Sequence, residues 1–357
     1  MYTALTKKTP FDWERWLKKR LAKSGGFFLT KACLAGLSWG YKAAVAIRHL
    51  AYDLKLLPIK RVRVPVVSVG ALVCGGTRKT PLTAHLAEMI GAPVGILTSG
   101  YAAKIQDSQK RVCSALQGDE AFLLSLKLPF AKVYAHSQRI VSARIAEKEG
   151  VAYILMDSGL QHRALHRDIE IITIDAKSPF GEGRFLPRGF LRDFPSRLKA
   201  ADWIVIMDSE SEMEFETLTQ ELRKIHPFAK FVGMRGAFAK PEVIKRKQIG
   251  MFCGIAAPES FEKMLKRQGC EIVNQKILSD HEPFEGVQAF VKICKSLGAE
   301  FVVCTEKDFV KIRPEESAGV LPLELVVEVA YGKEEYYKMI SAIKEKIEKK
   351  DDYERMG

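Results

Sequence analysis

The sequence lacks any pair of cysteines in a CxxC arrangement, although it contains seven cysteines among 357 residues. This absence excludes a zinc ribbon and a disulfide framework, and it fits a reducing compartment. Internal repeats and low-complexity tracts are also missing. Apolar residues make up 47% of the chain and charged residues 28%, which excludes wholesale disorder and fibrous folds.

A long apolar run is missing from the basic N-terminal leader, residues 1–60. The longest stretch without a charge there, residues 32–41, has ten residues, whereas about 20 are needed to cross hydrocarbon. Residues 11–22 and 27–54 have patterns typical of helices that carry basic and aromatic side chains. We therefore expect a membrane anchor that lies in the headgroup plane. The alternatives are a tilted span and an ordinary surface helix pair docked on the folded domain.

Positive charge is concentrated in this leader rather than spread over the chain. The formal net charge is +13, of which residues 1–63 contribute +11, and three of the four tryptophans lie there too. A nucleic-acid-binding protein usually places such charge on its folded binding face. We therefore expect the membrane surface, with its anionic phospholipid, or an acidic lipid substrate as partner, and no nucleic acid.

From residue 61 onward, short β-branched runs alternate with amphipathic segments. This alternation is typical of βαβ units and of a parallel sheet covered on both faces. A length of 357 residues favours two domains. We expect one α/β domain over 61–180, a Gly-, Pro- and Arg-rich joint over 181–197, and a second, smaller α/β domain over 198–357 that includes a helix near 333–349.

The most informative stretch is a glycine-rich turn between a strand near 65–71 and a helix expected over 79–90. The turn and the start of the helix contain Gly75, Gly76, Thr77, Arg78, Lys79 and Thr80. Such a turn aims backbone N–H groups and the positive end of the helix at phosphate oxygens. Lys79 can reach the outer phosphates of ATP, and the Thr80 hydroxyl can complete a Mg²⁺ shell. The sequence therefore predicts a P-loop NTPase-like domain, and a purely structural turn is the alternative.

One position in this turn departs from the P-loop pattern. Arg78 stands where a glycine normally precedes the lysine. If the backbone needs a positive φ there, a side chain costs about 1–2 kcal/mol. The guanidinium either crowds the nucleotide or binds phosphate itself.

An acidic residue at the carboxyl end of a nearby strand is the usual second contact for magnesium in P-loop proteins. Asp157 ends the apolar run of VAYILMD, which is expected to be a strand. We therefore predict that Asp157 binds or orients Mg²⁺, with a helix-capping role as the alternative.

These features together resemble the tetraacyldisaccharide 4′-kinase family, the lipid A 4′-kinases of Gram-negative bacteria. The resemblance runs from the leader to about residue 313, and is carried by PVVSVGALVCGGTRKTP, the GDE of residues 118–120, DSGLQHRALHRDIEIITIDA, FGEGRFLPRGFLRD, and the pair DHEPF and TEKDFVK. It implies a membrane-associated P-loop kinase at the cytoplasmic face of the inner membrane. The implied reaction transfers the γ-phosphoryl group of ATP to the 4′-hydroxyl of tetraacyldisaccharide 1-phosphate.

The resemblance also implies roles for residues at matching positions. Lys79 matches the phosphate-binding lysine, and Thr80 and Asp157 match the groups that serve Mg²⁺. Asp119 matches the general base on the sugar hydroxyl, with His281 as its partner. Taken alone, Asp119 also suits a helix N-cap and His281 a surface histidine. Four further positions match polar residues that line the substrate site: Glu120, Arg139, Gln161 and His162.

Several positions depart from the family pattern. Arg78 replaces glycine, Ser158 replaces the second acid of DDGLQH, Ser99 stands where an arginine is expected, and LPRGFLR introduces Arg188 and Phe190 in place of LPAGPLR. Because the predicted catalytic residues are all retained, we predict a working kinase. The alternative is a membrane-bound nucleotide-binding protein of the same family with reduced or lost activity.

Two other classes of protein compete with this interpretation. A nucleic-acid-dependent ATPase would use the basic leader as an arm, and it would bind DNA or RNA with a steep salt dependence. A metal hydrolase would combine Asp157 with His162 and His166, since a His-x3-His pair can share one helix face. The Trp-rich leader disfavours the first class, and the glycine-rich turn disfavours the second.

Overall fold

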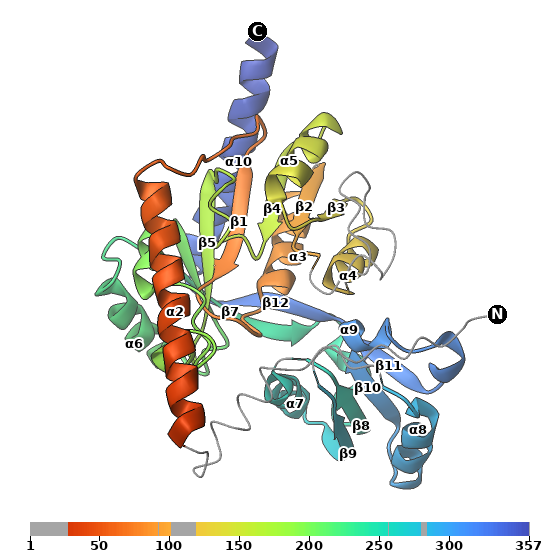
Figure 1. Cartoon of the computed structure of the whole chain (residues 1–357). Coiled ribbons are helices and arrows are strands. Elements are labelled where there is room, and N and C mark those ends of the chain that lie inside the picture. Colours follow the sequence, from red (N-terminus) through yellow and green to blue (C-terminus); the bar gives the residue numbers. More distant parts are fainter. Residues whose placement is uncertain (1–27, 92, 101–118, 256, 280–283, 357) are drawn as a thin grey trace, which may run out of the picture. The chain divides into compact units, whose positions relative to one another are not determined.

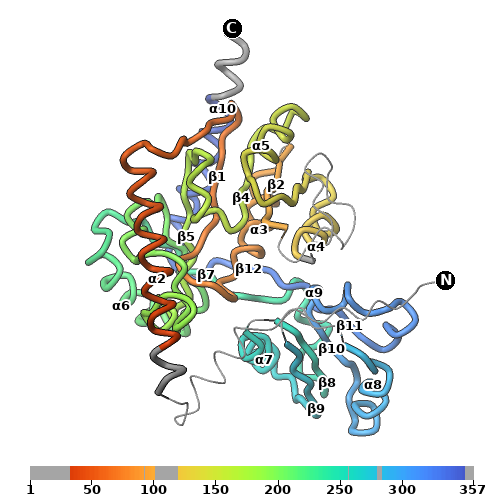
Figure 2. The backbone as a smooth tube through the Cα atoms, viewed as in Figure 1, coloured from red at the N-terminus to blue at the C-terminus, as the bar shows by residue number. Residues whose placement is uncertain are grey.

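The computed structural model describes residues 28–91, 93–100, 119–255, 257–279 and 284–356. The chain divides into two compact units. Of the described residues, the larger unit comprises those within 35–238 and 325–356, and the smaller unit comprises those within 239–324 together with 28–34. The chain therefore leaves the larger unit after residue 238 and returns to it at residue 325, as the colour gradient shows (Figures 1 and 2).

An eight-stranded sheet of order β12-β7-β6-β5-β1-β4-β2-β3 forms the centre of the larger unit. All neighbouring strands are parallel except β12 and β7, which are antiparallel. The strands are β1 (Val66–Ala71), β2 (Val94–Thr98), β3 (Lys132–Ala135), β4 (Tyr153–Asp157), β5 (Ile169–Asp175), β6 (Trp203–Met207), β7 (Lys230–Phe238) and β12 (Leu325–Tyr331).

Two apolar cores lie on opposite faces of this sheet. Val67 and Val69 of β1 belong to one core, whereas Val66 belongs to the other, because successive side chains of a strand point to opposite faces. The first core is completed by α3, α4 and α10, and the second by α5. The helices of this unit are α2 (Phe28–Asp53, which begins before residue 35), α3 (Lys79–Ile90), α4 (Asp119–Lys127), α5 (Arg139–Lys148), α6 (Glu212–Arg223) and α10 (Lys333–Met356).

The smaller unit has its own four-stranded parallel sheet, of order β11-β10-β8-β9. Its core gathers Phe252 from β8, Val302 from β10 and Phe290 from α8. The elements are β8 (Gln248–Cys253), β9 (Glu271–Ile277), β10 (Phe301–Thr305), β11 (Val320–Leu323), α7 (Pro258–Arg267), α8 (Val287–Ser296) and α9 (Glu306–Phe309). A unit with an apolar core of its own is what the length of the chain led us to expect.

The expected α/β class is confirmed, but the division of the chain differs from the expected one. We placed the start of the second domain at residue 198, whereas β6 and β7 belong to the large sheet. The final strand β12 and the C-terminal helix α10 also return to the larger unit. The Gly-, Pro- and Arg-rich segment 181–197 is therefore a loop within that unit and not a joint between domains. The helix expected over 27–54 is present as α2, whereas residues 11–22 lie outside the described residues.

Candidate active site

The glycine-rich turn connects β1 to α3 at the carboxyl edge of the large sheet. Its shape is held by a hydrogen bond from the Thr77 N–H to the Gly75 carbonyl, at 2.9 Å, and α3 begins at Lys79. Gly75 has a φ of 100°, a value that glycine adopts readily. The turn therefore has the strand–turn–helix form that directs N–H groups toward an anion.

Arg78 adopts the left-handed conformation, with a φ of 53° and a ψ of 30°. The position thus needs a positive φ, which costs a side-chain-bearing residue about 1–2 kcal/mol. The Arg78 Nε lies 2.5 Å from the Asp208 Oδ2, so its guanidinium is bound to a carboxylate that follows β6. Asp208 was not among the predicted site residues, although its place at the carboxyl end of a buried strand is the signal that identified Asp157.

Lys79 folds back over the turn. Its Nζ lies 2.9 Å from the Thr77 Oγ1 and 3.4 Å from the Gly75 carbonyl oxygen. Burial lowers the pKa of Lys79, and the negative charge of Asp157 opposes that shift. A lysine in this position lies beside the N-terminus of α3, where phosphate oxygens would bind.

The predicted magnesium residues lie next to each other. Thr80 donates a hydrogen bond from its Oγ1 to the Asp157 Oδ2, at 2.9 Å. The pairing of β1 with β4 explains this proximity, because Val69 is in register with Asp157. Burial raises the pKa of Asp157 to about 6, and the negative charge of Glu120 adds to the shift. Ser158, which stands where the family has a second acid, has a φ of 58° and adds a hydroxyl 3.5 Å from the Asp157 Oδ1.

The two predicted proton-transfer residues are less fully described. Asp119 is the first residue of α4, and only its backbone is described. His281 lies outside the described residues. Glu120, the next residue of α4, is exposed, and its charge acts on both Lys79 and Asp157. The N-terminus of α4 therefore lies near the phosphate-binding turn.

Arg139, predicted to line the substrate site, is only 2% exposed. Its guanidinium donates to the carbonyl oxygens of Thr98, His136 and Asp157. Burial lowers the pKa of Arg139 to about 10, and the charge of Asp157 opposes the shift. The buried side chain of Arg139 thus connects the carboxyl ends of β2, β3 and β4 by hydrogen bonds.

Gln161 and His162 follow β4 on the loop that leads to β5. The Gln161 Nε2 donates to the Ala71 carbonyl at the end of β1, at 3.1 Å. His162 is half-buried, and its pKa is lowered to about 4, first by burial and then by positive charges that include Arg139 and Arg192. His162 is therefore neutral at pH 7.

A metal hydrolase centre finds no support in the described part of the chain. No group of three or more His, Cys, Asp or Glu residues suited to hold a metal occurs there. His166 pairs instead with Asp168, whose Oδ1 lies 3.6 Å from the His166 Nε2.

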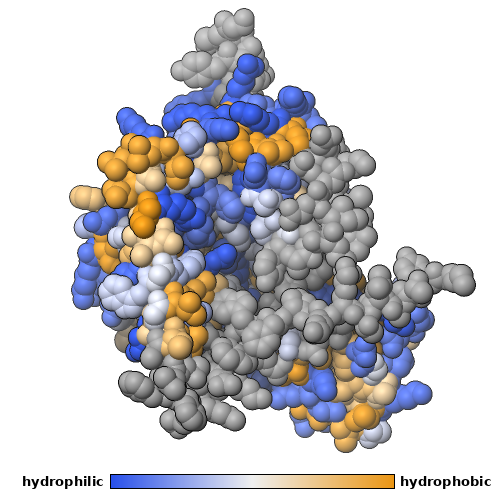
Figure 3. Space-filling view, in the orientation of Figure 1, coloured by the Kyte–Doolittle hydropathy of each residue, from blue (hydrophilic) through white to orange (hydrophobic). Residues whose placement is uncertain are grey.

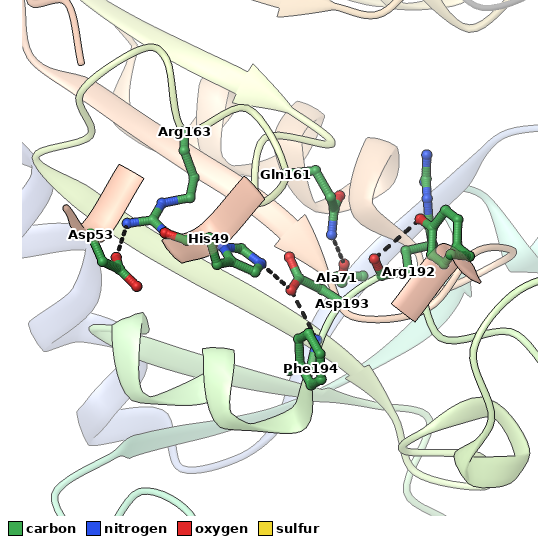
Figure 4. Close-up of polar contacts among 9 residues, drawn as sticks. His49, Asp53, Ala71, Gln161, Arg163, Arg192, Asp193 and Phe194 are labelled. Carbon is green, nitrogen blue, oxygen red and sulfur yellow. Dashed lines mark hydrogen bonds and ion pairs between the residues drawn. The ribbon is translucent and has the colours of Figure 1, made fainter. Parts of the chain in front are cut away.

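Helix α2 is connected to the site by contacts with the segment that follows residue 184. The Ser38 hydroxyl donates to the Phe185 carbonyl at 2.8 Å, and the His49 Nε2 lies 2.6 Å from the Oδ1 of the fully buried Asp193. The other ring nitrogen of His49 lies 2.9 Å from the Arg163 Nη1. Figure 4 shows this chain of contacts from Arg163 through His49 to Asp193, beside Gln161 and Ala71. We did not predict these contacts, because the partners lie more than 100 residues apart in the sequence.

The same segment pairs with the start of the glycine-rich turn. The Arg192 N–H donates to the Leu72 carbonyl at 2.8 Å, and the Cys74 N–H donates to the Phe190 carbonyl at 2.9 Å. Helix α2, residues 190–193 and the phosphate-binding turn are therefore connected by consecutive hydrogen bonds.

This geometry places the larger unit among the P-loop nucleotide-binding proteins, in which a turn after a central strand holds phosphate beside a metal-binding threonine and aspartate. The model of the Tetraacyldisaccharide-1-P 4′-kinase family, LpxK, matches residues 30–345. The chain belongs to this family, whose name describes a phosphotransferase.

Individual relatives agree with that family. Tetraacyldisaccharide 4′-kinase of Chlamydia pneumoniae is 34% identical over 289 residues, which cover 74% of this chain and 78% of the relative. The enzyme of Desulfotalea psychrophila is 34% identical over 311 residues, covering 80% and 89%. Among solved structures, LpxK from Aquifex aeolicus in complex with ATP is similar with a TM-score of 0.66 and 26% identity, covering 88% of this chain and 99% of that one.

Proposed function

We propose that this protein transfers the γ-phosphoryl group of ATP to the 4′-hydroxyl of tetraacyldisaccharide 1-phosphate. The observation that carries the proposal is the turn itself, where Lys79 and the Thr80–Asp157 pair lie at the start of α3 in a chain of this kinase family. Phosphoryl transfer requires positioning and charge stabilisation more than covalent chemistry. The turn can supply both.

The residues at the start of α3 and the end of β4 suit Mg²⁺ as the ion that accompanies ATP. The ion prefers oxygen ligands, takes few of them from the protein, and shares the rest with phosphate and water. The Thr80 hydroxyl and the Asp157 carboxylate are two such oxygen donors, 2.9 Å apart. Bound Mg²⁺ would supply neutralisation of charge on the phosphates.

The chain's own groups would divide the remaining work. Lys79 neutralises phosphate charge, and the N–H groups of the turn hold the phosphates in line. Asp119, the predicted base, accepts the 4′-hydroxyl proton as the sugar oxygen bonds to the γ-phosphorus and the bond from that phosphorus to the bridging oxygen of ADP breaks. His281 is the predicted partner of Asp119. The Asp119→Ala variant should therefore lose kcat while it keeps its affinity for ATP.

The acceptor is a lipid, and α2 has a surface suited to a membrane. Leu37, Trp39, Ile47 and Leu50 are each more than half exposed, whereas Ser38 and Val45 face the protein. Apolar surface follows α2 on the face shown in Figure 3. Within the described residues, no helix is long and apolar enough to cross a membrane. We infer that α2 rests on anionic phospholipid at the cytoplasmic face of the inner membrane, with its docked face held by the network of Figure 4.

A transfer assay tests the proposed function. Purified full-length protein, with ATP and Mg²⁺, should phosphorylate tetraacyldisaccharide 1-phosphate in detergent micelles. Lys79→Ala should reduce the rate about a hundredfold or more. Lys338→Ala, which removes an exposed lysine paired with Glu334 on α10, is the matched control and should retain the rate. ATP binding without transfer would support the alternative of a family member that has lost activity, and no ATP binding at millimolar concentration would refute a kinase.

A further inference from the structure

Arg78, in the phosphate-binding turn, forms an ion pair with Asp208, the residue that follows β6. The Arg78 Nε lies 2.5 Å from the Asp208 Oδ2, and the two side chains are only 10% and 16% exposed. An ion pair this well shielded from solvent has a defined geometry, unlike an exposed pair of flexible side chains.

Asp208 is itself fixed by two backbone contacts from β7. Its Oδ1 accepts the Gly236 N–H at 2.9 Å, and its own N–H donates to the Met234 carbonyl at 2.8 Å. Asp208 has a φ of 62°, a conformation that aspartate tolerates better than most residues. Two hydrogen bonds to β7, an internal strand of the sheet, thus fix Asp208 beside Arg78.

Gly236 provides the space in which the guanidinium lies. A Cβ at this position would be 2.4 Å from the Arg78 Cζ and 2.5 Å from its Nη1. The backbone of Gly236 is not in the left-handed region, so a Cβ at this position would displace the guanidinium without straining the backbone. Two independent features, a carboxylate and a missing side chain, therefore accommodate the same guanidinium.

We propose that Asp208 is a positioning residue for phosphoryl transfer, which acts through Arg78. By binding the guanidinium over Gly236, it holds Arg78 in its left-handed conformation, and with it the turn that receives the triphosphate of ATP. A turn with glycine at this position has no such need, because glycine adopts positive φ at little cost. The inference rests on the proposed function for its substrate, ATP.

The test measures ATP affinity directly, by titration of the full-length protein with a fluorescent ATP analogue and Mg²⁺, with no lipid acceptor present. Asp208→Ala should weaken binding about thirtyfold or more, the order expected when one partner of a shielded ion pair is lost. In the transfer assay, KM for ATP should rise by a similar factor, with a much smaller change in kcat. Gly236→Ala should give the same pattern, because it displaces the guanidinium without removing a charge.

A second substitution at Arg78 shows whether Asp208 acts by positioning Arg78 or has only a general structural role. Adding Arg78→Gly to Asp208→Ala, or to Gly236→Ala, should recover most of the lost affinity. The matched control is Glu328→Ala, which breaks the exposed ion pair of Glu328 with Arg235 on β12 and β7. It should leave ATP affinity unchanged.

Three outcomes would overturn the inference: wild-type affinity in Asp208→Ala, wild-type affinity in Gly236→Ala, or double variants that are as weak as the single ones. If Asp208→Ala does not fold, as judged by its circular dichroism, the Gly236→Ala series decides alone. A wild-type protein that binds no ATP would count against the proposed function, whereas normal ATP binding in all variants would count only against Asp208.

Discussion

The contact between α2 and the body of the larger unit allows a quantitative prediction for His49→Ala. His49 donates from its Nε2 to the buried Asp193 at 2.6 Å and accepts at its other ring nitrogen from Arg163. Removing the ring takes a hydrogen-bond partner from a carboxylate that is 0% exposed. Loss of a hydrogen bond to a charged group costs about 1.5–3 kcal/mol, and the edge contact of the ring with Phe194 is lost as well. Asp193 keeps the Phe194 N–H at 2.9 Å, so we expect a total of about 2–4 kcal/mol and not more.

Amide hydrogen exchange is the appropriate measurement, because it reports the local opening of α2 separately from unfolding of the smaller unit. A loss of 2–4 kcal/mol corresponds to exchange in the docked part of α2 that is faster by about thirtyfold to several hundredfold. His49→Gln, which can still donate to Asp193, should recover part of the protection. Exchange in α10 should not change. If α2 in His49→Ala exchanges at the wild-type rate, the contact with Asp193 does not hold the helix and the reasoning is refuted.

Three further predictions concern the metal position, the half-buried His162 and the membrane face. Asp157→Asn should lower transfer about a hundredfold or more, and calorimetry should show ATP binding that Mg²⁺ no longer strengthens; a retained Mg²⁺ effect would contradict the assignment. Folding lowers the pKa of His162 from 6.5 to about 4, so the free energy of unfolding falls as the pH falls through this range. In urea unfolding, the loss of this free energy between pH 7 and pH 5 should be about 1–2 kcal/mol smaller for His162→Gln than for the wild type. Equal losses in the two proteins would contradict the pKa shift. Replacing Trp39, Ile47 and Leu50 by serine should abolish flotation with vesicles that contain anionic phospholipid, and unchanged flotation would exclude this face as the membrane contact.

Local patterns in the sequence were sufficient for the elements that form the phosphate-binding turn. The helix expected over 79–90 has those bounds in the structure, and Asp157 ends β4 as its apolar run indicated. These features follow from short-range rules, because buried strands need continuous apolar residues and a turn with glycine and proline marks the start of a helix.

Which sheet each strand joins was not predictable in the same way. An apolar run such as β6 looks alike whether it extends the first sheet or begins a second one, and β12 rejoins the first sheet only after the chain has built the smaller unit. The same limit applies to side-chain partners. Arg78 and Asp208 are 130 residues apart, and no local pattern connects them.

The contacts of Arg78 and Ser158 change how these two departures from the family pattern affect the charge at the turn. Counted from the sequence, Arg78 adds a positive charge at the nucleotide, and Ser158 removes a negative one. In the structure the charge of Arg78 is paired with Asp208, and the Ser158 hydroxyl lies within 3.5 Å of the Asp157 carboxylate. The local charge at the turn therefore changes less than the sequence implies, because the added cation has its own counter-ion. Asp208 and Gly236 together accommodate the guanidinium of the arginine that stands at the P-loop glycine position, which favours the predicted working kinase over a turn disrupted by that arginine.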